Sequence, residues 1–366
     1  MSTPTPDTFK VLLGKLVKTP ELFTASDLKV ALNHLFTPDA VLPAQIGAFL
    51  LALRNARVER KPGNLAAAAD ALRSYAVEIA LEDGDKDFVV DIVGTGGDGH
   101  NTFNVSTTAA IVAAGAGARV VKHGNRASTS SSGSADLLER LDCLFVPPTP
   151  GTVVPISRAP FTFILAPHYH PSLATIAPYR RALPFRTLFN VLGPLINPAR
   201  PKGMVLGVAE RELGLPFAKS LLDGGVKRAL VVCGAENLDE ISCAGDSWAW
   251  ELRDGQITEG KLHPEQFGLP VHPLTAVAGG TAAENAETLK ALLRSGEDIP
   301  EHLTPILHFV MLNASALLVV AGLAKDYKHG VRLALESMTS GAAWKALEAF
   351  RDAGRLALSK VDSQRE

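Results

Sequence analysis

Two loops rich in glycine, serine and threonine carry the residues of this chain that could bind a phosphate. The first reads Gly-Thr-Gly-Gly-Asp over 94–98, and the second reads Lys-His-Gly-Asn-Arg-Ala-Ser-Thr-Ser over 122–130. Glycines let the backbone approach a ligand closely, because they adopt conformations that side chains forbid. Lys122 and Arg126 add the positive charge that a polyphosphate needs. The first loop alone fits a plain tight turn equally well, but a basic loop about one βα unit later favours a phosphate site.

The segments around these loops alternate between strand and helix patterns. Apolar runs at 88–93 and 119–121 are typical of buried strands. A loop that leads from the end of a strand into a helix is where α/β folds bind anions. Asn104, Ser106 and Thr107 open the helix after the first loop, where they can cap it or face a phosphate. The glycine spacing fits neither a Walker P-loop nor the dinucleotide fingerprint.

Asp239 and Glu240 are the best candidates for a metal site. They lie in a predicted loop after the apolar strand 228–233, where both can reach one cleft, whereas on a straight strand they would point to opposite faces. Mg²⁺ usually binds one or two carboxylates together with substrate phosphates and waters. Without further context, an exposed acidic pair is the commoner interpretation. A zinc site is not indicated, because the His168-Tyr-His170 pair lacks two further ligands at suitable spacing.

The composition bounds the class of protein. The chain has 366 residues, 46% of them hydrophobic and 20% charged, which predicts a globular protein with a large core and two domains. A net charge of −2 argues against a nucleic-acid-binding surface. The longest apolar run, 309–324, is interrupted by polar residues and predicts a buried helix and no membrane span. The N-terminus lacks signal-peptide features, and the spacing of Cys143, Cys233 and Cys243 predicts neither disulfides nor a zinc motif, so a cytoplasmic location fits.

Periodicity predicts the elements that position these loops. The first part predicts only helices, at 8–18, 26–36, 43–57 and 64–80, and hence a small helical domain over 1–84. The apolar face of the third helix, Ile46, Phe49, Leu50 and Leu53, suits core packing or a subunit interface. Later strands at 161–166, 205–208 and 228–233 alternate with helices and predict a mainly parallel sheet. A hairpin over 248–257 and three helices, near 282–294, 304–324 and 331–357, complete the predicted elements.

Four motifs together resemble the anthranilate phosphoribosyltransferase family over nearly the whole chain, and look closest to its fungal-type members. They are the two loops, Phe-Arg-Thr-Leu-Phe-Asn-Val-Leu-Gly-Pro-Leu-Ile-Asn-Pro over 185–198, and Asn-Leu-Asp-Glu-Ile over 237–241. The resemblance implies an enzyme of tryptophan biosynthesis that joins anthranilate to phosphoribosyl pyrophosphate with Mg²⁺ and releases pyrophosphate. It also implies the phosphorylase-like architecture of a small helical domain and a large α/β domain, with the active site in the cleft between them. The helical domain would be completed by 168–196, the α/β domain would comprise 85–167 and 197–366, and the enzyme would be a homodimer through the helical domain.

The resemblance carries over residue by residue to the site. The positions that would line the phosphoribosyl pyrophosphate site are Gly94, Gly97, Asp98, Thr102, Asn104, Val105, Ser106, Thr107, Lys122, His123, Gly124, Asn125, Arg126, Ala127, Ser128, Thr129, Ser130 and Ser134. The anthranilate positions are Gly94, Asn125, His170 and Arg180, and the metal positions are Ser106, Asp239 and Glu240. No catalytic acid or base is assigned, because the amine of anthranilate is neutral at pH 7 and already nucleophilic, so catalysis should rest on positioning and electrostatics. Of the adjacent Arg180 and Arg181, at most one can point into the cleft.

Two alternatives remain for the function. A pyrimidine nucleoside phosphorylase shares the architecture and a similar first loop, but its family lacks the Asn-Arg-Ala-Ser-Thr-Ser and Phe-Asn-Val-Leu-Gly-Pro runs. A non-catalytic, family-like nucleic-acid-binding protein should show a basic surface and a degraded acidic pair. The net charge of −2 and the intact Asp239-Glu240 pair count against it.

Overall fold

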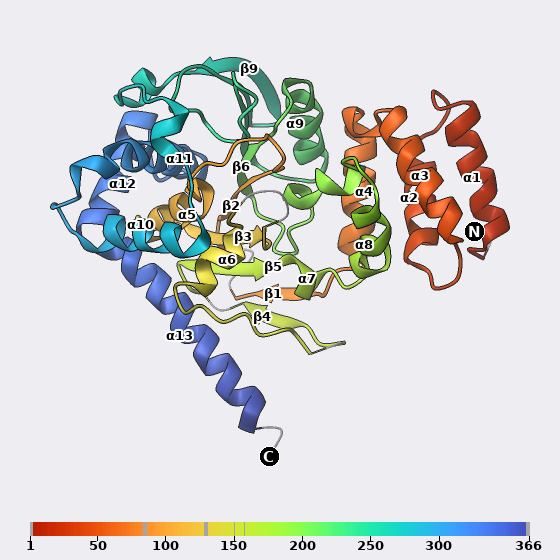
Figure 1. Cartoon of the computed structure of the whole chain (residues 1–366), viewed down its shortest axis with the longest axis horizontal. Helices are drawn as coiled ribbons and strands as arrows, with labels where there is room; N and C mark the ends of the chain where they lie inside the picture. Colours follow the sequence, from red (N-terminus) through yellow and green to blue (C-terminus); the bar gives the residue numbers. More distant parts are fainter. Residues whose placement is uncertain (1–2, 83–85, 128–130, 150, 157, 364–366) are drawn as a thin grey trace.

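Five helices form one side of the molecule (Figure 1). They are α1 (Pro6–Lys18), α2 (Ala25–Phe36), α3 (Pro43–Asn55), α4 (Pro62–Ser74) and, from later in the chain, α8 (Leu173–Ala182). The fold is that of a computed structural model, which describes residues 3–82, 86–127, 131–149, 151–156 and 158–363. Thr5 and Thr24 cap α1 and α2 with their side-chain oxygens, which satisfies backbone N–H groups of the first turn. The apolar face of α3, from Ile46 to Leu53, is at most 4% exposed, which confirms the core-packing interpretation of that face.

The helix predicted over 64–80 is wrong after residue 74. α4 ends at Ser74, and the chain then forms the short strand β1 (Ile79–Leu81), which pairs in parallel with β4 (Val154–Ile156). The backbone N–H of Val77 also donates to the carbonyl of Tyr169. These partners are distant in the chain, so a helix-like local pattern did not reveal the pairing.

A seven-stranded sheet forms the centre of the larger part, and its strand order is β5-β3-β2-β6-β7-β8-β9. The first five are parallel: β5 (Phe161–Leu165), β3 (Arg119–Gly124), β2 (Val89–Gly94), β6 (Gly203–Gly207) and β7 (Arg228–Gly234). The antiparallel hairpin of β8 (Ser247–Arg253) and β9 (Gln256–Leu262) turns at Asp254 and Gly255, both with positive φ. The predicted α/β fold with a mainly parallel sheet is confirmed.

Helices cover both faces of this sheet. On one face, strand residues such as Val205 and Leu230 form a core with the helices that cover that face. On the other face, Met204 and Val231 form a second core with α9 (Gly214–Asp223) and the five-helix part. The helices of the first face are α5 (Val105–Gly115), α10 (Ala282–Arg294), α11 (Thr304–Ala321), α12 (Tyr327–Thr339) and α13 (Ala342–Ser363). The short helices are α6 (Ser134–Glu139), α7 (Ala166–Tyr169), η1 (Val58–Arg60), η2 (Leu188–Asn190), η3 (Gly193–Leu195), η4 (Arg211–Leu213), η5 (Pro264–Phe267), η6 (Leu274–Val277) and η7 (Glu301–Leu303).

The structure corrects one of the helices predicted at the end of the chain and confirms another. The helix expected over 331–357 is two helices, because the chain turns at Gly341, whose φ of +77° favours glycine. Residues 301–321 would be long and apolar enough to cross a membrane, but 72% of an apolar 18-residue window within that stretch is buried inside the protein. The prediction of a buried helix there is therefore confirmed.

Candidate active site

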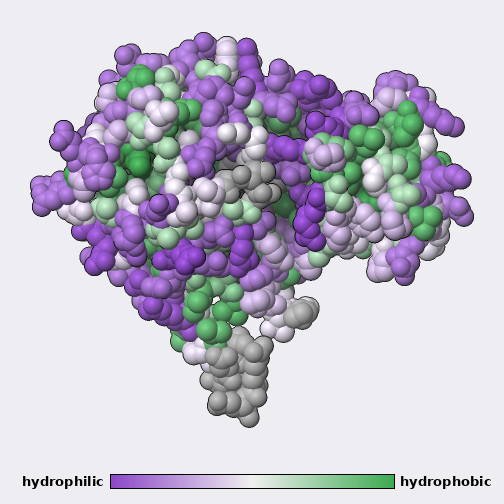
Figure 2. Space-filling view, viewed as in Figure 1, coloured by the Kyte–Doolittle hydropathy of each residue, from purple (hydrophilic) through white to green (hydrophobic). Residues whose placement is uncertain are grey.

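The carboxyl ends of the parallel strands and the helix α8 surround a cavity of about 430 Å³. Residues from both predicted loops, from the acidic pair after β7 and from the segment 186–196 line it. Figure 2 shows the surface hollowed between the α/β part and the five-helix part. β2 and β3 are neighbours in the sheet, so the two loops meet as the sequence predicts.

The first glycine loop lies against the acidic pair. The backbone N–H of Gly96 donates to Oδ2 of Asp239 at 2.6 Å. A Cβ atom on Gly94 would lie 2.2 Å from that same oxygen, and one on Gly97 would lie 2.1 Å from the guanidinium of Arg186. Gly97 also has a φ of +74°. The loop therefore needs glycine at both positions, because a side chain would displace the groups that surround the cavity.

Asp239 and Glu240 both face the cavity from the turn after β7. Burial, and next the charge of Asp98, raises the pKa of Asp239 to about 7. Burial, and next the charge of Asp239, raises the pKa of Glu240 well above its usual range. The Ser106 hydroxyl hydrogen-bonds Glu240. A cation would offset the cost of two buried charges, and two carboxylates with a hydroxyl are the hard oxygen donors that Mg²⁺ prefers.

Lys122 is a strand residue, which corrects its assignment to a loop. β3 continues through Gly124 because its pairing with β5 continues that far. The Lys122 side chain is only 2% exposed, and its Nζ donates to the carbonyl of Ile92 and lies 3.4 Å from Oγ of Ser106. Burial lowers its pKa, while Asp91 and the acidic pair oppose that shift. The ammonium therefore lies beside the predicted metal ligands.

Five predicted residues of the second loop line the cavity beyond Lys122, namely His123, Gly124, Asn125, Arg126 and Ala127. The guanidinium of Arg126 pairs with Glu139 at 2.5 Å. Ser134, which follows the loop, also lines the cavity. Ser128, Thr129 and Ser130 lie outside the described residues.

His123 lines the cavity, and His170 packs behind it with ring centroids 5.2 Å apart. Burial lowers the pKa of His123 to about 4 and that of His170 to about 3, so both are neutral at pH 7. Nδ1 of His123 lies 3.1 Å from the carbonyl of Gly193, which fixes the ring. His168 lies beside a different cavity.

Arg180 and Arg186 also line the cavity. Arg180 lies over the ring of Phe189, 5.8 Å from its centroid, while Arg181 is exposed. Nε of Arg180 is buried and has no hydrogen-bond partner among the described residues. Sequence analysis missed Arg186, although it lies in the Phe-Arg-Thr motif. It donates to the carbonyls of Thr95 and Gly97, both at 3.1 Å, and so holds the first loop.

Three residues that the sequence analysis places at the phosphoribosyl pyrophosphate site do not line this cavity. Thr102 forms a β-bridge with Ala278, and Val105 is 2% exposed in the core. Asp98 accepts from the backbone N–H of Asp239 at 3.4 Å. Their contact with a ligand, like that of His170, stays a prediction. Asn104, Ser106 and Thr107 do line the cavity.

A cavity with two glycine loops, buried carboxylates and three arginines suits an enzyme that handles phosphate groups, and comparisons with known proteins agree. Residues 86–344 match the model of the glycosyl transferase family, a/b domain. The anthranilate phosphoribosyltransferase of Schizosaccharomyces pombe is 45% identical over 93% of this chain and 96% of that protein. The chain thus belongs to the anthranilate phosphoribosyltransferase family, as its motifs predict.

Solved structures of the Saccharomyces cerevisiae anthranilate phosphoribosyltransferase are similar to this chain. One, in complex with PRPP and Mg, is 32% identical with a TM-score of 0.85, and covers 96% of this chain and 99% of that chain. Another, in complex with 4-fluoroanthranilate, is 31% identical with a TM-score of 0.83 and the same coverage.

Proposed function

We propose that this enzyme transfers the phosphoribosyl group of phosphoribosyl pyrophosphate to the amine of anthranilate, giving N-(5-phosphoribosyl)anthranilate and pyrophosphate in tryptophan biosynthesis. The observation that carries the proposal is one cavity that joins the two loops, the acidic pair and Arg180 in a chain of this family. Transfer from phosphoribosyl pyrophosphate requires the leaving group to be neutralised and the amine to be aligned with the anomeric carbon.

The two loops would hold the donor. Lys122 and Arg126 supply positive charge, and the N-terminus of α5 supplies backbone N–H groups and the hydroxyl of Thr107. Ser106, Asp239 and Glu240 would hold Mg²⁺, which, when bound, neutralises the charge that develops on pyrophosphate. Arg186 would keep the first loop in place through its two carbonyl contacts.

Arg180 would orient the acceptor. A guanidinium fork suits a planar carboxylate, and the buried, unpartnered Nε of Arg180 leaves a donor for it. Asn125 and Gly94 lie in the same cavity and would contact the ring and amine. Both neighbouring histidines are neutral at pH 7, so they would shape the pocket and not act as acids. Catalysis would then rest on alignment and charge.

The test is the loss of anthranilate fluorescence with phosphoribosyl pyrophosphate and Mg²⁺ present, and with each omitted in turn. We expect the fluorescence of anthranilate to fall only when phosphoribosyl pyrophosphate and Mg²⁺ are both present. A matched assay should supply uridine or thymidine with inorganic phosphate, the substrates of the alternative phosphorylase activity. Phosphorolysis without anthranilate consumption would overturn the proposal. The intact acidic pair, which shares one cavity with Arg180, supports the transferase over the nucleic-acid-binding alternative.

We also propose a homodimer through α1 and α3, in a cytoplasmic enzyme. Val11 and Val17 of α1 are 72% and 60% exposed, and Leu51 of α3 is 45% exposed, while the two helices pack together. Figure 2 shows apolar residues exposed on this part. Light scattering should report a dimer that Val11→Asp with Leu51→Asp dissociates. Leu215→Asp on α9, at an apolar residue that is 39% exposed, is the control and should leave the dimer intact. A monomeric parent protein would refute the dimer.

A further inference from the structure

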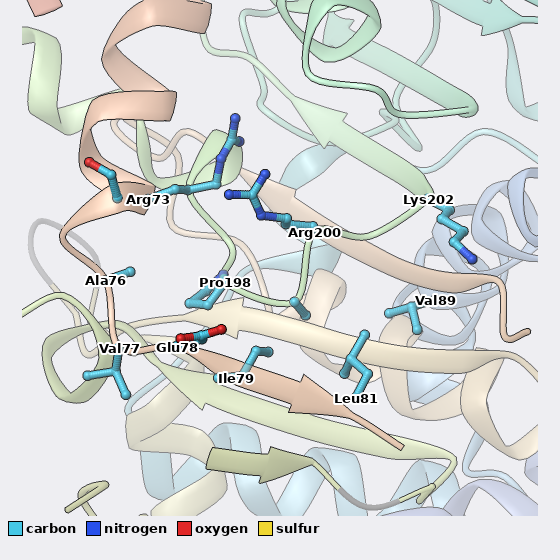
Figure 3. A pocket seen from close by; sticks show the side chains of 12 residues that line it. Arg73, Ala76, Val77, Glu78, Ile79, Leu81, Val89, Pro198, Arg200 and Lys202 are labelled. Carbon is cyan, nitrogen blue, oxygen red and sulfur yellow. The ribbon is translucent and has the colours of Figure 1, made fainter. Parts of the chain in front are cut away.

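Two adjoining cavities beside the active site are lined by basic side chains. The larger is about 630 Å³ and the smaller about 230 Å³, and both are lined by Arg73, Arg200 and Lys202. Lys227 also lines the smaller one. Figure 3 shows the larger cavity, with Arg73 at the end of α4 and Arg200 in the segment before β6 close to each other.

The segment 193–197 separates these cavities from the active site. Gly193 and Ile196 line the active-site cavity, Leu195 and Asn197 line the smaller basic cavity, and Pro194 lines both. No basic residue is common to the two sites among the described residues. The basic cavities are therefore a separate place for a ligand, next to the catalytic one.

The charge around the smaller cavity is one-sided. Among the residues that the structure describes, no aspartate or glutamate lines it, although four basic residues do. The guanidinium of Arg73 is held by the carbonyl of Leu195 and the carboxylate of Asp70, each at 2.5 Å. Positive side chains that converge on a cavity repel one another, so an anion bound between them would be stabilised.

Ser220 supplies a second and independent observation. Its residue is 3% exposed, and its Oγ is buried without a hydrogen-bond partner among the described residues. Ser220 also lines the smaller cavity. A buried hydroxyl without a partner is unfavourable unless a ligand or water completes its hydrogen bond. Such a hydroxyl can donate to an anion bound in the cavity.

The larger cavity adds an apolar wall. Val77, Ile79, Leu81 and Val89 line it, and the carboxylate of Glu78 lies among them, as Figure 3 shows. Arg200, which lines both cavities, has a backbone φ of +46°, a left-handed conformation that is uncommon for an arginine and is often found at functional sites.

We propose that these two adjoining cavities together bind a small organic phosphate. Its phosphate group would lie in the smaller cavity between Arg200, Lys227 and Ser220, and its apolar body would lie against the wall of the larger cavity. Phosphate suits this place because it accepts several charge-assisted hydrogen bonds at once.

The experiment is a calorimetric titration of the full chain with phenyl phosphate, with and without saturating phosphoribosyl pyrophosphate and Mg²⁺ to fill the active site. We expect one saturable site when the donor fills the active site, with weaker binding of inorganic phosphate and of benzoate at that site. No saturable binding would overturn the proposal. Because Arg180 would also take an aromatic carboxylate, benzoate is titrated into the Arg180→Ala variant. Benzoate binding there as tightly as phenyl phosphate would overturn the phosphate assignment. Inorganic phosphate binding as tightly as phenyl phosphate would overturn the role of the apolar wall.

Variants test whether phenyl phosphate binds in these cavities and not elsewhere on the protein. Arg200→Ala with Lys227→Ala should weaken phenyl phosphate binding by about tenfold or more. Ser220→Ala should weaken it roughly fivefold without lowering the melting temperature, because Oγ has no partner to lose in the protein. Lys219→Ala, exposed on the same helix, is the matched control and should bind normally. Unchanged affinity in the double variant and in Ser220→Ala would refute the site. The readout is binding, so failure of the proposed transferase activity would leave this result standing.

Discussion

Asp239→Asn should make the ligand-free enzyme more stable while it abolishes turnover. Asp239 is 9% exposed, and burial together with the charge of Asp98 raises the pKa of its carboxyl from 3.8 to about 7. Asparagine keeps the shape and an oxygen for the N–H of Gly96, but carries no charge. The ligand-free enzyme therefore no longer bears the cost of ionising a buried group, whereas the bound metal loses a charged ligand.

The pKa sets the size and the direction of the effect. Because the folded enzyme binds the Asp239 proton more tightly than the unfolded chain, the free energy of unfolding falls as pH rises from about 4 to about 7. A pKa change of about 3 corresponds to about 4 kcal/mol, an upper bound because the site can relax. We expect the variant to gain roughly 2–4 kcal/mol above pH 7 and almost nothing below pH 4.

Thermal melting at pH 4, 5.5 and 8, without Mg²⁺ and without donor, measures this gain. Asp246→Asn is the matched control, because it removes the same charge from an exposed residue whose pKa is lowered by its hydrogen bond to Lys261. That control should not be stabilised. Activity is then measured by anthranilate fluorescence at saturating Mg²⁺, where we expect a loss of orders of magnitude, greater still with Glu240→Gln added.

Two results would refute the reasoning in different places. A variant no more stable than the parent at pH 8 would mean that Asp239 is ionised at little cost in the ligand-free enzyme. Near-normal turnover at saturating Mg²⁺ would remove Asp239 from the metal site, whatever its effect on stability.

Further predictions concern the basic residues of the cavity and the metal. Arg180→Ala should raise the KM for anthranilate far more than that for the donor, and Arg181→Ala should change neither; steady-state kinetics decide, and the reverse pattern would contradict the alignment through α8. Arg180→Lys should rescue only partly, because an ammonium lacks the planar fork. Lys122→Ala should weaken donor binding in calorimetry by about 1–3 kcal/mol, and unchanged affinity would give Lys122 a structural role. Arg186→Lys should raise the donor KM roughly tenfold, because one ammonium cannot hold both loop carbonyls; a normal KM would show that the loop is held without Arg186. EDTA should abolish turnover, and added Mg²⁺ should restore it, while turnover that persists in EDTA would exclude the metal.

Local patterns in the sequence were sufficient for the α/β class and most of its elements. The alternation of apolar strands with helices predicts β2, β3, β5, β6 and β7, because a strand or helix pattern depends on neighbouring residues. The order of the motifs along the chain was sufficient for the family. Where an element depends on a distant partner, the same reasoning failed, as for β1, whose partner β4 lies more than seventy residues away.

The glycines and the acidic pair were also evident in the sequence, because their residue types restrict the chemistry that they can perform. The tertiary structure alone decided the individual contacts among these groups. It placed Asp239 against the first glycine loop, buried Lys122 in a strand beside the acidic pair, and brought Arg186 across to two carbonyls of that loop. Burial and the charges of distant residues raise the pKa of Asp239 and lower that of Lys122, so neither shift can be inferred from the local sequence.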